Sequence, residues 1–247
     1  MPDLDLCYLT AGEALRRFAA KTLSPVELMK AVIARAEAVE PAINAFTFKY
    51  YDEALQKARA AEARWMKGEP LGPLDGIATA VKDESSIAGY PTTNASEILR
   101  DFVPETTSPT NERLLEAGMI VHARTATPEF SCAAFTHSRM WGVSRNPWNT
   151  AFTPGGSSGG SGAALAAGST TIATGSDIGG SIRIPASCCG VVGFKPPYGR
   201  NPDDPPFSLD FYNHTGPMAR SVEDIVLMQN VMAGPHPRDI ATVRPKL

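Results

Sequence analysis

The sequence has 247 residues, of which 43% are hydrophobic, and its 23 basic and 26 acidic side chains give a formal net charge of −3. This size and composition are typical of a globular protein that can bury a sizeable core. Because the net charge is small and both signs are interspersed, neither nucleic acid nor an anionic membrane is expected as a partner. No run of about 18 apolar residues exists, so no transmembrane helix is expected.

The N-terminal residues lack the basic and apolar stretches of a secretory signal, which favours a cytoplasmic location. The four cysteines, at positions 7, 132, 188 and 189, are too sparse for a disulfide scaffold, and we expect them to be reduced. Neither they nor the four histidines show the spacing of a zinc site, so the sequence predicts no metal and no cofactor.

The first third of the chain has helix signals. Thr10–Glu13 and Ser24–Glu27 have the pattern of capping boxes, and apolar residues recur at helical spacing after the second box. Pro41 is expected to end that helix, and a third helix is expected over Asp52–Lys67 with a glycine after it. Residues 1–70 are therefore predicted to form a helical segment that packs on the core.

From residue 71 onwards, strand and helix signals alternate. Short apolar segments at 76–82 and 119–123 predict strands, and residues 109–117 between them predict a helix. Such alternation favours an α/β fold with some parallel pairing. The sequence predicts one domain overall, with its core over 71–247.

Further on, a helix is expected at 163–167, a strand at 170–174 and a helix at 221–232. The small residues around these elements indicate close backbone packing rather than a flexible linker. Residues 196–217 are rich in proline and are expected to form an irregular loop.

Three sites could carry chemistry. Lys82 ends an apolar strand, Gly155–Gly162 is a glycine- and serine-rich block, and Gly175–Arg183 reads GSDIGGSIR. Taken singly, each has an ordinary explanation: a surface lysine, a flexible loop, and a tight turn with an Asp–Arg pair. The glycine-rich block lacks the lysine of a phosphate-binding loop.

Taken together, these motifs resemble the amidase signature family. The stretch Thr153–Gly199, TPGGSSGGSGAALAAGSTTIATGSDIGGSIRIPASCCGVVGFKPPYG, fits the family's signature almost without a break. Ser157 and Ser181 are 24 positions apart, and Lys82 precedes Ser157 by 75, as in the family. The resemblance extends from about residue 10 to residue 234. It implies the amidase signature fold, an α/β fold with a mixed central sheet flanked by helices.

The resemblance implies that Lys82 is the base, Ser157 the proton relay and Ser181 the nucleophile of a serine amidohydrolase. An unactivated serine is a poor nucleophile, so a base must take its proton. A lysine can do so only when neutral, and its ordinary pKa of about 10.4 must therefore be lowered by burial or by nearby positive potential. The apolar strand before Lys82 is a suitable place to desolvate its amine.

The resemblance also implies a cis peptide bond between Gly156 and Ser157. It implies an oxyanion hole made by the backbone N–H groups of Ile178, Gly179, Gly180 and Ser181. Side chains larger than hydrogen at position 179 or 180 are expected to disturb both this turn and the hole.

Other residues of the motifs are expected to support the site. Asp177 and Arg183 flank the nucleophile and are interpreted as holding its turn, and Ser158 as a structural hydrogen-bonding residue. Ser131 and Cys132 fall where family members often line the acyl pocket.

Two alternatives remain open. Gly155–Gly159 satisfies the G-x-S-x-G pattern of α/β-hydrolases, with Ser157 as nucleophile and His214 or His236 as base, although no strong strand precedes it. The second alternative is the amidotransferase subunit of the same family, which works with partner subunits on misacylated tRNA. Residues 127–141 look more like the stand-alone hydrolases of the family.

Family members usually have about twice this length. The resemblance therefore implies that the later strands of the sheet, and much of the substrate pocket, lie in a C-terminal half that this chain lacks. That half is an expected partner, as is a small-molecule amide, ester or carbamate substrate. A homodimer is a further alternative.

Overall fold

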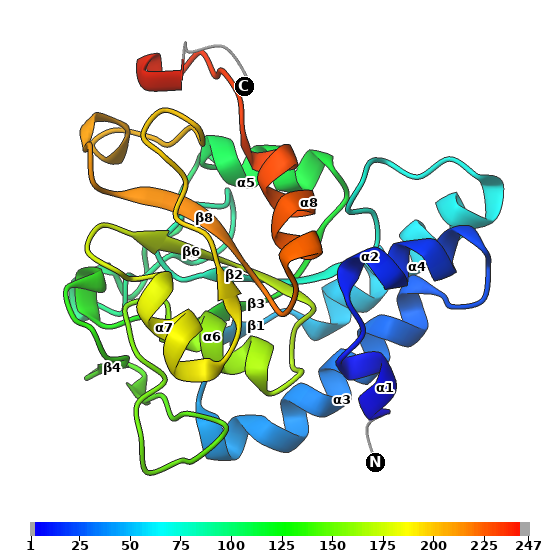
Figure 1. The fold of residues 1–247 in the computed structure, drawn as a ribbon, viewed down its shortest axis with the longest axis horizontal. Coiled ribbons are helices and arrows are strands. Elements are labelled where there is room, and N and C mark those ends of the chain that lie inside the picture. The colour runs from blue at the N-terminus through cyan, green and yellow to red at the C-terminus, as the bar shows by residue number, and fades with distance from the viewer. Residues whose placement is uncertain (1–2, 243–247) are drawn as a thin grey trace.

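The computed structural model describes residues 3–242 and contains a six-stranded sheet with the order β1-β3-β2-β6-β8-β7 (Figure 1). Its strands are β1 (Phe46–Lys49), β2 (Ala78–Lys82), β3 (Ile120–Thr125), β6 (Ile172–Asp177), β7 (Val192–Gly193) and β8 (His214–Ala219). A separate hairpin consists of β4 (His137–Ser138) and β5 (Gly142–Val143). The helices are α1 (Leu4–Cys7), α2 (Ala11–Ala19), α3 (Pro25–Ile43), α4 (Tyr51–Lys67), α5 (Pro109–Glu116), α6 (Gly159–Ala166), α7 (Arg183–Cys189) and α8 (Val222–Met232).

The sheet is mixed. Strand β2 is parallel to β3 and to β6, whereas β8 is antiparallel to both β6 and β7, and β1 is antiparallel to β3. The expectation of an α/β fold with a mixed central sheet flanked by helices is confirmed.

Alternating strand residues face two separate apolar clusters. On β6 and β8, Ile172 and Ala219 belong to a cluster with side chains of α2, α3, α4, α5 and α8. The neighbouring residues Ala173 and Met218 belong to a second cluster with α6 and α7. Figure 1 shows α5 and α8 on one side of the strands and α6 and α7 on the other. Both faces of the sheet are thus covered, as a largely apolar central sheet requires.

The predicted helix signals are largely confirmed. Ser24 and Glu27 form a reciprocal capping box at the start of α3, and Gly68 caps α4 in the left-handed conformation. The prediction that Pro41 ends its helix is wrong, because α3 continues through it to Ile43. The helix ends at Ile43, two residues after the proline, and Asn44, which has a φ of 47°, caps it in the left-handed region.

Strand β1 was not predicted. It lies within the first 70 residues, which the sequence predicts to be helical, and pairs with β3 at one edge of the sheet. The buried Glu40 carboxylate accepts the N–H groups of Ala45 and Phe46, at 3.2 and 3.0 Å, and so turns the chain from α3 into β1. The domain boundary near residue 70 stays a prediction.

The second wrong prediction concerns β8. Its residues 214–217 were expected to belong to an irregular loop, but they continue into a strand that is buried over most of its length between β6 and β7. Gly216 and Pro217 obscure the strand in the sequence, since both residue types are depleted in strands. Within residues 3–242, no helix is long and apolar enough to cross a bilayer.

The start of α6 is wedged between two other segments. The Gly160 N–H donates to the Ala126 carbonyl at 3.1 Å, and the Ala126 N–H donates to the Ala45 carbonyl at 2.8 Å. A Cβ atom on Gly160 would overlap the backbone of Ala126 and lie 2.5 Å from the Ala45 oxygen. These atoms belong to the backbone, so they cannot move aside cheaply.

We expect Gly160→Ala to destabilise the protein by about 3 kcal/mol or to prevent folding, since overpacking against backbone is costly. The matched control is Gly12→Ala. Gly12 is also the second residue of its helix, and its added Cβ would lie at an ordinary 3.7 Å from the nearest atoms. Urea unfolding followed by circular dichroism measures both variants, and equal midpoints would contradict the packing described here.

Candidate active site

The candidate site forms at the carboxyl ends of two parallel strands. Lys82 is the last residue of β2, while Ser176 and Asp177 end β6. Because β2 and β6 are parallel neighbours, these ends meet at the same edge of the sheet. Ser157 immediately precedes the segment that opens α6, and α6 packs against β2, β3 and β6.

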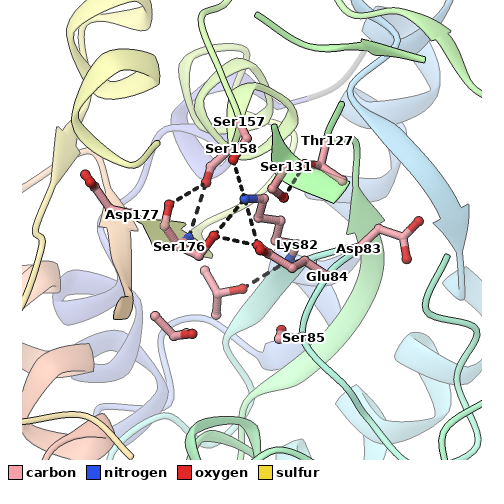
Figure 2. A network of polar contacts seen from close by, with 12 residues as sticks. Lys82, Asp83, Glu84, Ser85, Thr127, Ser131, Ser157, Ser158, Ser176 and Asp177 are labelled. Atoms are coloured by element: carbon pink, nitrogen blue, oxygen red, sulfur yellow. Dashed lines mark hydrogen bonds and ion pairs between the residues drawn. The ribbon is translucent and has the colours of Figure 1, made fainter. Parts of the chain in front are cut away.

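The Lys82 amine contacts three oxygen atoms. Its Nζ lies 2.8 Å from Ser157 Oγ, 2.8 Å from Ser176 Oγ and 2.8 Å from Glu84 Oε2. Figure 2 shows these side chains converging on the amine from different segments. The structure therefore brings together two of the three residues expected to react, Lys82 and Ser157.

Burial controls the protonation of this amine. Lys82 is 1% exposed, and burial lowers the pKa of its amine, while the Glu84 carboxylate acts in the opposite direction. For Glu84 itself, burial raises the pKa of the carboxyl, but the Lys82 charge and hydrogen bonds outweigh it and hold this pKa below its usual range. The combination favours an ionised Glu84 beside a lysine that can lose its proton.

Ser157 and Ser158 tie the glycine-rich block to β6 and to the next motif. The Gly156–Ser157 peptide bond is cis, as the family resemblance implies. The Ser158 hydroxyl donates to the Ser176 carbonyl at 3.4 Å and accepts the Ser176 N–H at 3.3 Å. The Ser158 N–H donates to the carbonyl of Ser181 at 3.1 Å, so the two serine motifs lie side by side.

The Ser181 hydroxyl is partly buried and forms no hydrogen bond with Ser157 or any other residue between positions 3 and 242. Hydrogen bonds of a reacting group are often long or unformed without substrate. The contact between Lys82 and Ser157 is therefore present in the structure, while the contact between Ser157 and Ser181 and the relay itself stay predictions.

The Asp177 carboxylate holds the turn that carries Ser181. It accepts the backbone N–H groups of Gly180, Ile182 and Arg183 at 2.7 to 3.3 Å. The Arg183 guanidinium adds two hydrogen bonds of 2.9 Å. Burial tends to raise the pKa of Asp177, but the bonds from Arg183 and from these N–H groups hold it below its usual value. These contacts fit the expected positions of Asp177 and Arg183 around the turn.

Within this turn, one of the four N–H groups expected in the oxyanion hole already has an acceptor. The Gly180 N–H is engaged by Asp177, whereas the N–H groups of Ile178, Gly179 and Ser181 have no acceptor within the described part of the chain. The expected steric sensitivity holds at Gly180, where φ is +127° and a Cβ would lie 2.8 Å from Ile184 Cδ1. At Gly179 it is wrong, because nothing lies within 4 Å of an added Cβ.

The two residues expected to line the acyl pocket, Ser131 and Cys132, have different surroundings. Ser131 shares a hydrogen bond of 2.9 Å with Thr127 (Figure 2), and its hydroxyl helps to lower the pKa of the Glu84 carboxyl. Cys132 is exposed, and its thiol is directed at the carbonyl of Phe130, 3.2 Å away. That Ser131 and Cys132 line the acyl pocket stays a prediction.

Behind Lys82, a buried ion pair fixes the loop that follows β2. Asp83 accepts the N–H and the hydroxyl of Thr93 at 2.8 and 2.5 Å. The guanidinium of Arg124, which is fully buried, lies 3.9 Å from the Asp83 carboxylate and donates to the carbonyl of Ser85 at 2.7 Å. Asp83 and Lys82 therefore point into different surroundings, although they are neighbours in the sequence.

Glu84 was not identified from the sequence. A tight turn, in which its N–H donates to the carbonyl of Lys82 at 2.8 Å, brings its side chain back to the lysine amine. The available signal was an acidic residue two positions after a lysine that ends a buried strand. The sequence alone does not say in which direction such a turn points its side chain.

The α/β-hydrolase alternative is wrong. Ser157 is bound by Lys82, whereas His214 contacts the carbonyl of Phe211 at 3.1 Å and His236 lies 3.3 Å from Glu112. A nucleophile elbow also requires a strand that leads directly into the serine, and residues 153–158 form no strand.

We expect Asp177→Asn to lower the free energy of unfolding by about 2 kcal/mol near pH 7, since it weakens hydrogen bonds to a charged group. The folded pKa of Asp177 is depressed, so its contribution is present above the unfolded pKa and is lost as pH falls through the folded value. The difference between wild type and variant should thus shrink over the acidic range below the ordinary aspartate pKa of about 3.9. Urea titrations across this range measure it.

The control for this prediction is Arg183→Gln, which removes the exposed partner and should cost less than about 1 kcal/mol. A difference between wild type and Asp177→Asn that does not change with pH would contradict the role given to the carboxylate charge.

Three comparisons place the chain among known proteins. A model of the Amidase family matches residues 27–246. A glutamyl-tRNA(Gln) amidotransferase subunit from Carboxydothermus hydrogenoformans is 42% identical over 240 residues, which cover 96% of this chain and 49% of that protein.

Two solved structures show the same arrangement. A bacterial aryl acylamidase of the amidase signature enzymes has a TM-score of 0.90 and 36% identity, over 97% of this chain and 50% of its own. The peptide amidase of Stenotrophomonas maltophilia has a TM-score of 0.89 and 32% identity, over 96% of this chain and 50% of its own. This chain spans about half the length of these relatives, and it belongs to the amidase signature family.

Proposed function

We propose that this chain carries the reacting residues of a serine amidohydrolase that cleaves the C–N bond of an amide through an acyl-enzyme on Ser181. The observation that supports it best is the 2.8 Å contact between the buried Lys82 amine and the Ser157 hydroxyl. A lysine whose pKa is lowered by burial and that contacts one serine, with a second serine motif alongside, is arranged for base-assisted nucleophilic attack.

The proposed reaction moves one proton in each direction along the relay. The neutral amine of Lys82 accepts the proton of Ser157, which in turn accepts the proton of Ser181 as its oxygen bonds to the carbonyl carbon. The oxyanion is stabilised by the N–H groups of Ile178, Gly179 and Ser181, which have no acceptor within the described residues. When the C–N bond breaks, the proton on Lys82 returns through Ser157 to the leaving amine, and water then hydrolyses the acyl-enzyme by the same relay.

The amidotransferase subunit remains the second candidate function. It is favoured by the 42% identity to the glutamyl-tRNA(Gln) amidotransferase protein of Carboxydothermus hydrogenoformans, which extends over 96% of this chain. The same lysine and serines would then release ammonia from an amide for use by partner subunits. The expected likeness of residues 127–141 to stand-alone hydrolases is the argument on the other side.

Substrate, partners and location are proposals of the same kind. An aryl or small aliphatic amide is the proposed substrate, with esters and carbamates as alternatives. The rest of the family fold, which the relatives carry outside the matched half, is the proposed partner of this chain in forming the pocket. Likeness to amidotransferase subunits supports a cytoplasmic location.

A covalent trap tests the nucleophile. The full-length polypeptide is treated with a fluorophosphonate probe, and peptide mass spectrometry locates the adduct, which we expect on Ser181. Ser181→Ala should abolish labelling, while Ser169→Ala should leave it intact, because Ser169 is a buried serine after α6 whose hydroxyl donates to the Ala164 carbonyl of that helix. An adduct on Ser157 would overturn the assignment.

The pH dependence of turnover tests the base. Activity on a panel of anilides, primary amides, esters and carbamates should fall as pH drops through the pKa of Lys82, because a protonated amine cannot accept the serine proton. Lys82→Ala should lose about 10³-fold in kcat/KM and should also lose this acid limb. An unchanged pH profile in that variant would exclude Lys82 as the base.

Glutamine separates the two candidate functions. A stand-alone amidase should hydrolyse members of the panel without any partner, whereas an amidotransferase subunit should release ammonia from glutamine only when its partner subunits are present. The measurement is ammonia release from glutamine and from the panel, by the full-length polypeptide alone and with co-purified partners. Panel activity together with partner-independent turnover would exclude the subunit function.

A further inference from the structure

The Glu84 carboxylate contacts the base of the proposed relay, but the catalytic scheme proposed above gives it no role. Its Oε2 atom is 2.8 Å from Lys82 Nζ and accepts the hydroxyl of Ser176 at 2.5 Å. The side chain is only 12% exposed. Such a carboxylate opposes the loss of a proton from a lysine that must act as a neutral base.

The hydrogen-bond donors and acceptors around the amine match in number. A neutral amine has two N–H donors and one lone pair, and an ionised carboxylate can only accept. Since Ser176 gives its own proton to Glu84, its oxygen is left to accept from Lys82. Glu84 and Ser176 thus take the two N–H groups of the amine, and the lone pair is left for the third neighbour.

That third neighbour is Ser157, at 2.8 Å. We propose that Glu84 is a positioning residue of the relay: with Ser176, its carboxylate takes up both N–H groups of Lys82 and so directs the lone pair of the amine at the hydroxyl of Ser157. This inference rests on the proposed function, in which the lone pair is the group that receives the proton.

The same carboxylate sets the pH at which the relay works. Its negative charge favours the ammonium form and so opposes the effect of burial on the pKa of Lys82. Two other carboxylates face this region: Asp177 from β6, which is paired with Arg183 and lies 3.8 Å from Lys195, and Asp203.

Asp203 lies across a small cavity of about 20 Å³, which Lys82 and Glu84 also line. Burial raises the pKa of Asp203 to about 6, and the charge of Glu84 adds to this effect. It accepts the Thr215 hydroxyl at 2.8 Å and does not contact the lysine amine. Asp203 therefore provides a nearby charge that can be removed without touching the relay.

A direct titration of Lys82 tests the proposal. In protein labelled with ¹³C at lysine Cε, the Lys82 signal is identified by its loss in Lys82→Met and followed by NMR against pH. Glu84→Gln keeps the shape of the side chain and removes its charge, so the Lys82 midpoint should fall by at least one pH unit, about tenfold in proton affinity. Glu84→Asp keeps the charge and should return the midpoint toward wild type.

Two matched controls separate the effect of direct contact on the Lys82 midpoint from the effect of a nearby charge. Ser176→Ala removes a hydrogen bond to the amine but no charge, and Asp203→Asn removes a charge but no hydrogen bond to the amine. Each should move the Lys82 midpoint by less than half as much as Glu84→Gln does. A shift in Asp203→Asn equal to that in Glu84→Gln would overturn the role of direct contact.

Turnover provides the second readout. The acid limb of kcat/KM should move to lower pH in Glu84→Gln by the same amount as the NMR midpoint, while the plateau should fall because the lone pair is less well directed. An NMR midpoint that stays in place, or an acid limb that does not follow it, would overturn the proposal. The NMR titration needs no substrate, so failure of the proposed function can be recognised separately. In that case the Lys82 midpoint would still shift in Glu84→Gln, but the wild-type protein would hydrolyse no substrate of the panel.

A reciprocal measurement covers the case in which Glu84→Gln does not fold. The Glu84 carboxyl, labelled with ¹³C at Cδ, should titrate at higher pH in Lys82→Met than in wild type, because the lysine charge is what holds its pKa down. Equal midpoints in the two proteins would show that the two groups are not coupled and would also overturn the proposal.

Discussion

The site depends on one constraint: a lysine amine is held without bulk water at the carboxyl ends of two parallel strands. Lys82 is 1% exposed, and within residues 3–242 its amine contacts polar atoms from β6, from the loop after β2 and from the segment before α6. Burying an unpaired charge would be costly, so the amine must either lose its proton or keep close acceptors. Glu84 and Ser176 supply the acceptors, and burial lowers the pKa of the amine.

Much of this arrangement could be predicted from local sequence signals. The Ser24–Glu27 capping box, Gly68 at the end of α4 and the apolar segment before Lys82 each act over a few residues, and the structure contains all three features. The contact between Lys82 and Ser157 could not be predicted from local signals. It followed from the spacing shared with the amidase signature family, because no local rule brings together residues 75 positions apart.

The predictions failed where distant parts of the chain decide the structure. Strand β1 has only four residues and exists because β3 offers it an edge, while β8 carries Gly216 and Pro217 and is stabilised by strands on both sides. Glu84 was overlooked because the direction of a side chain after a tight turn depends on backbone geometry. At Gly179 the motif suggested crowding, but the turn around Asp177 leaves that position open to solvent.

The stack of Ala45, Ala126 and Gly160 links Ser157 to a region far away in the sequence. The carbonyl of Ala45 accepts from Ala126, whose own carbonyl accepts from Gly160 at the start of the helix that follows Ser157. Lengthening the connection between α3 and β1 by even one residue would therefore shift the end of β3 and tilt that helix. Surface loops normally tolerate insertions, but this short connection should not, although it contributes no atom to the chemistry.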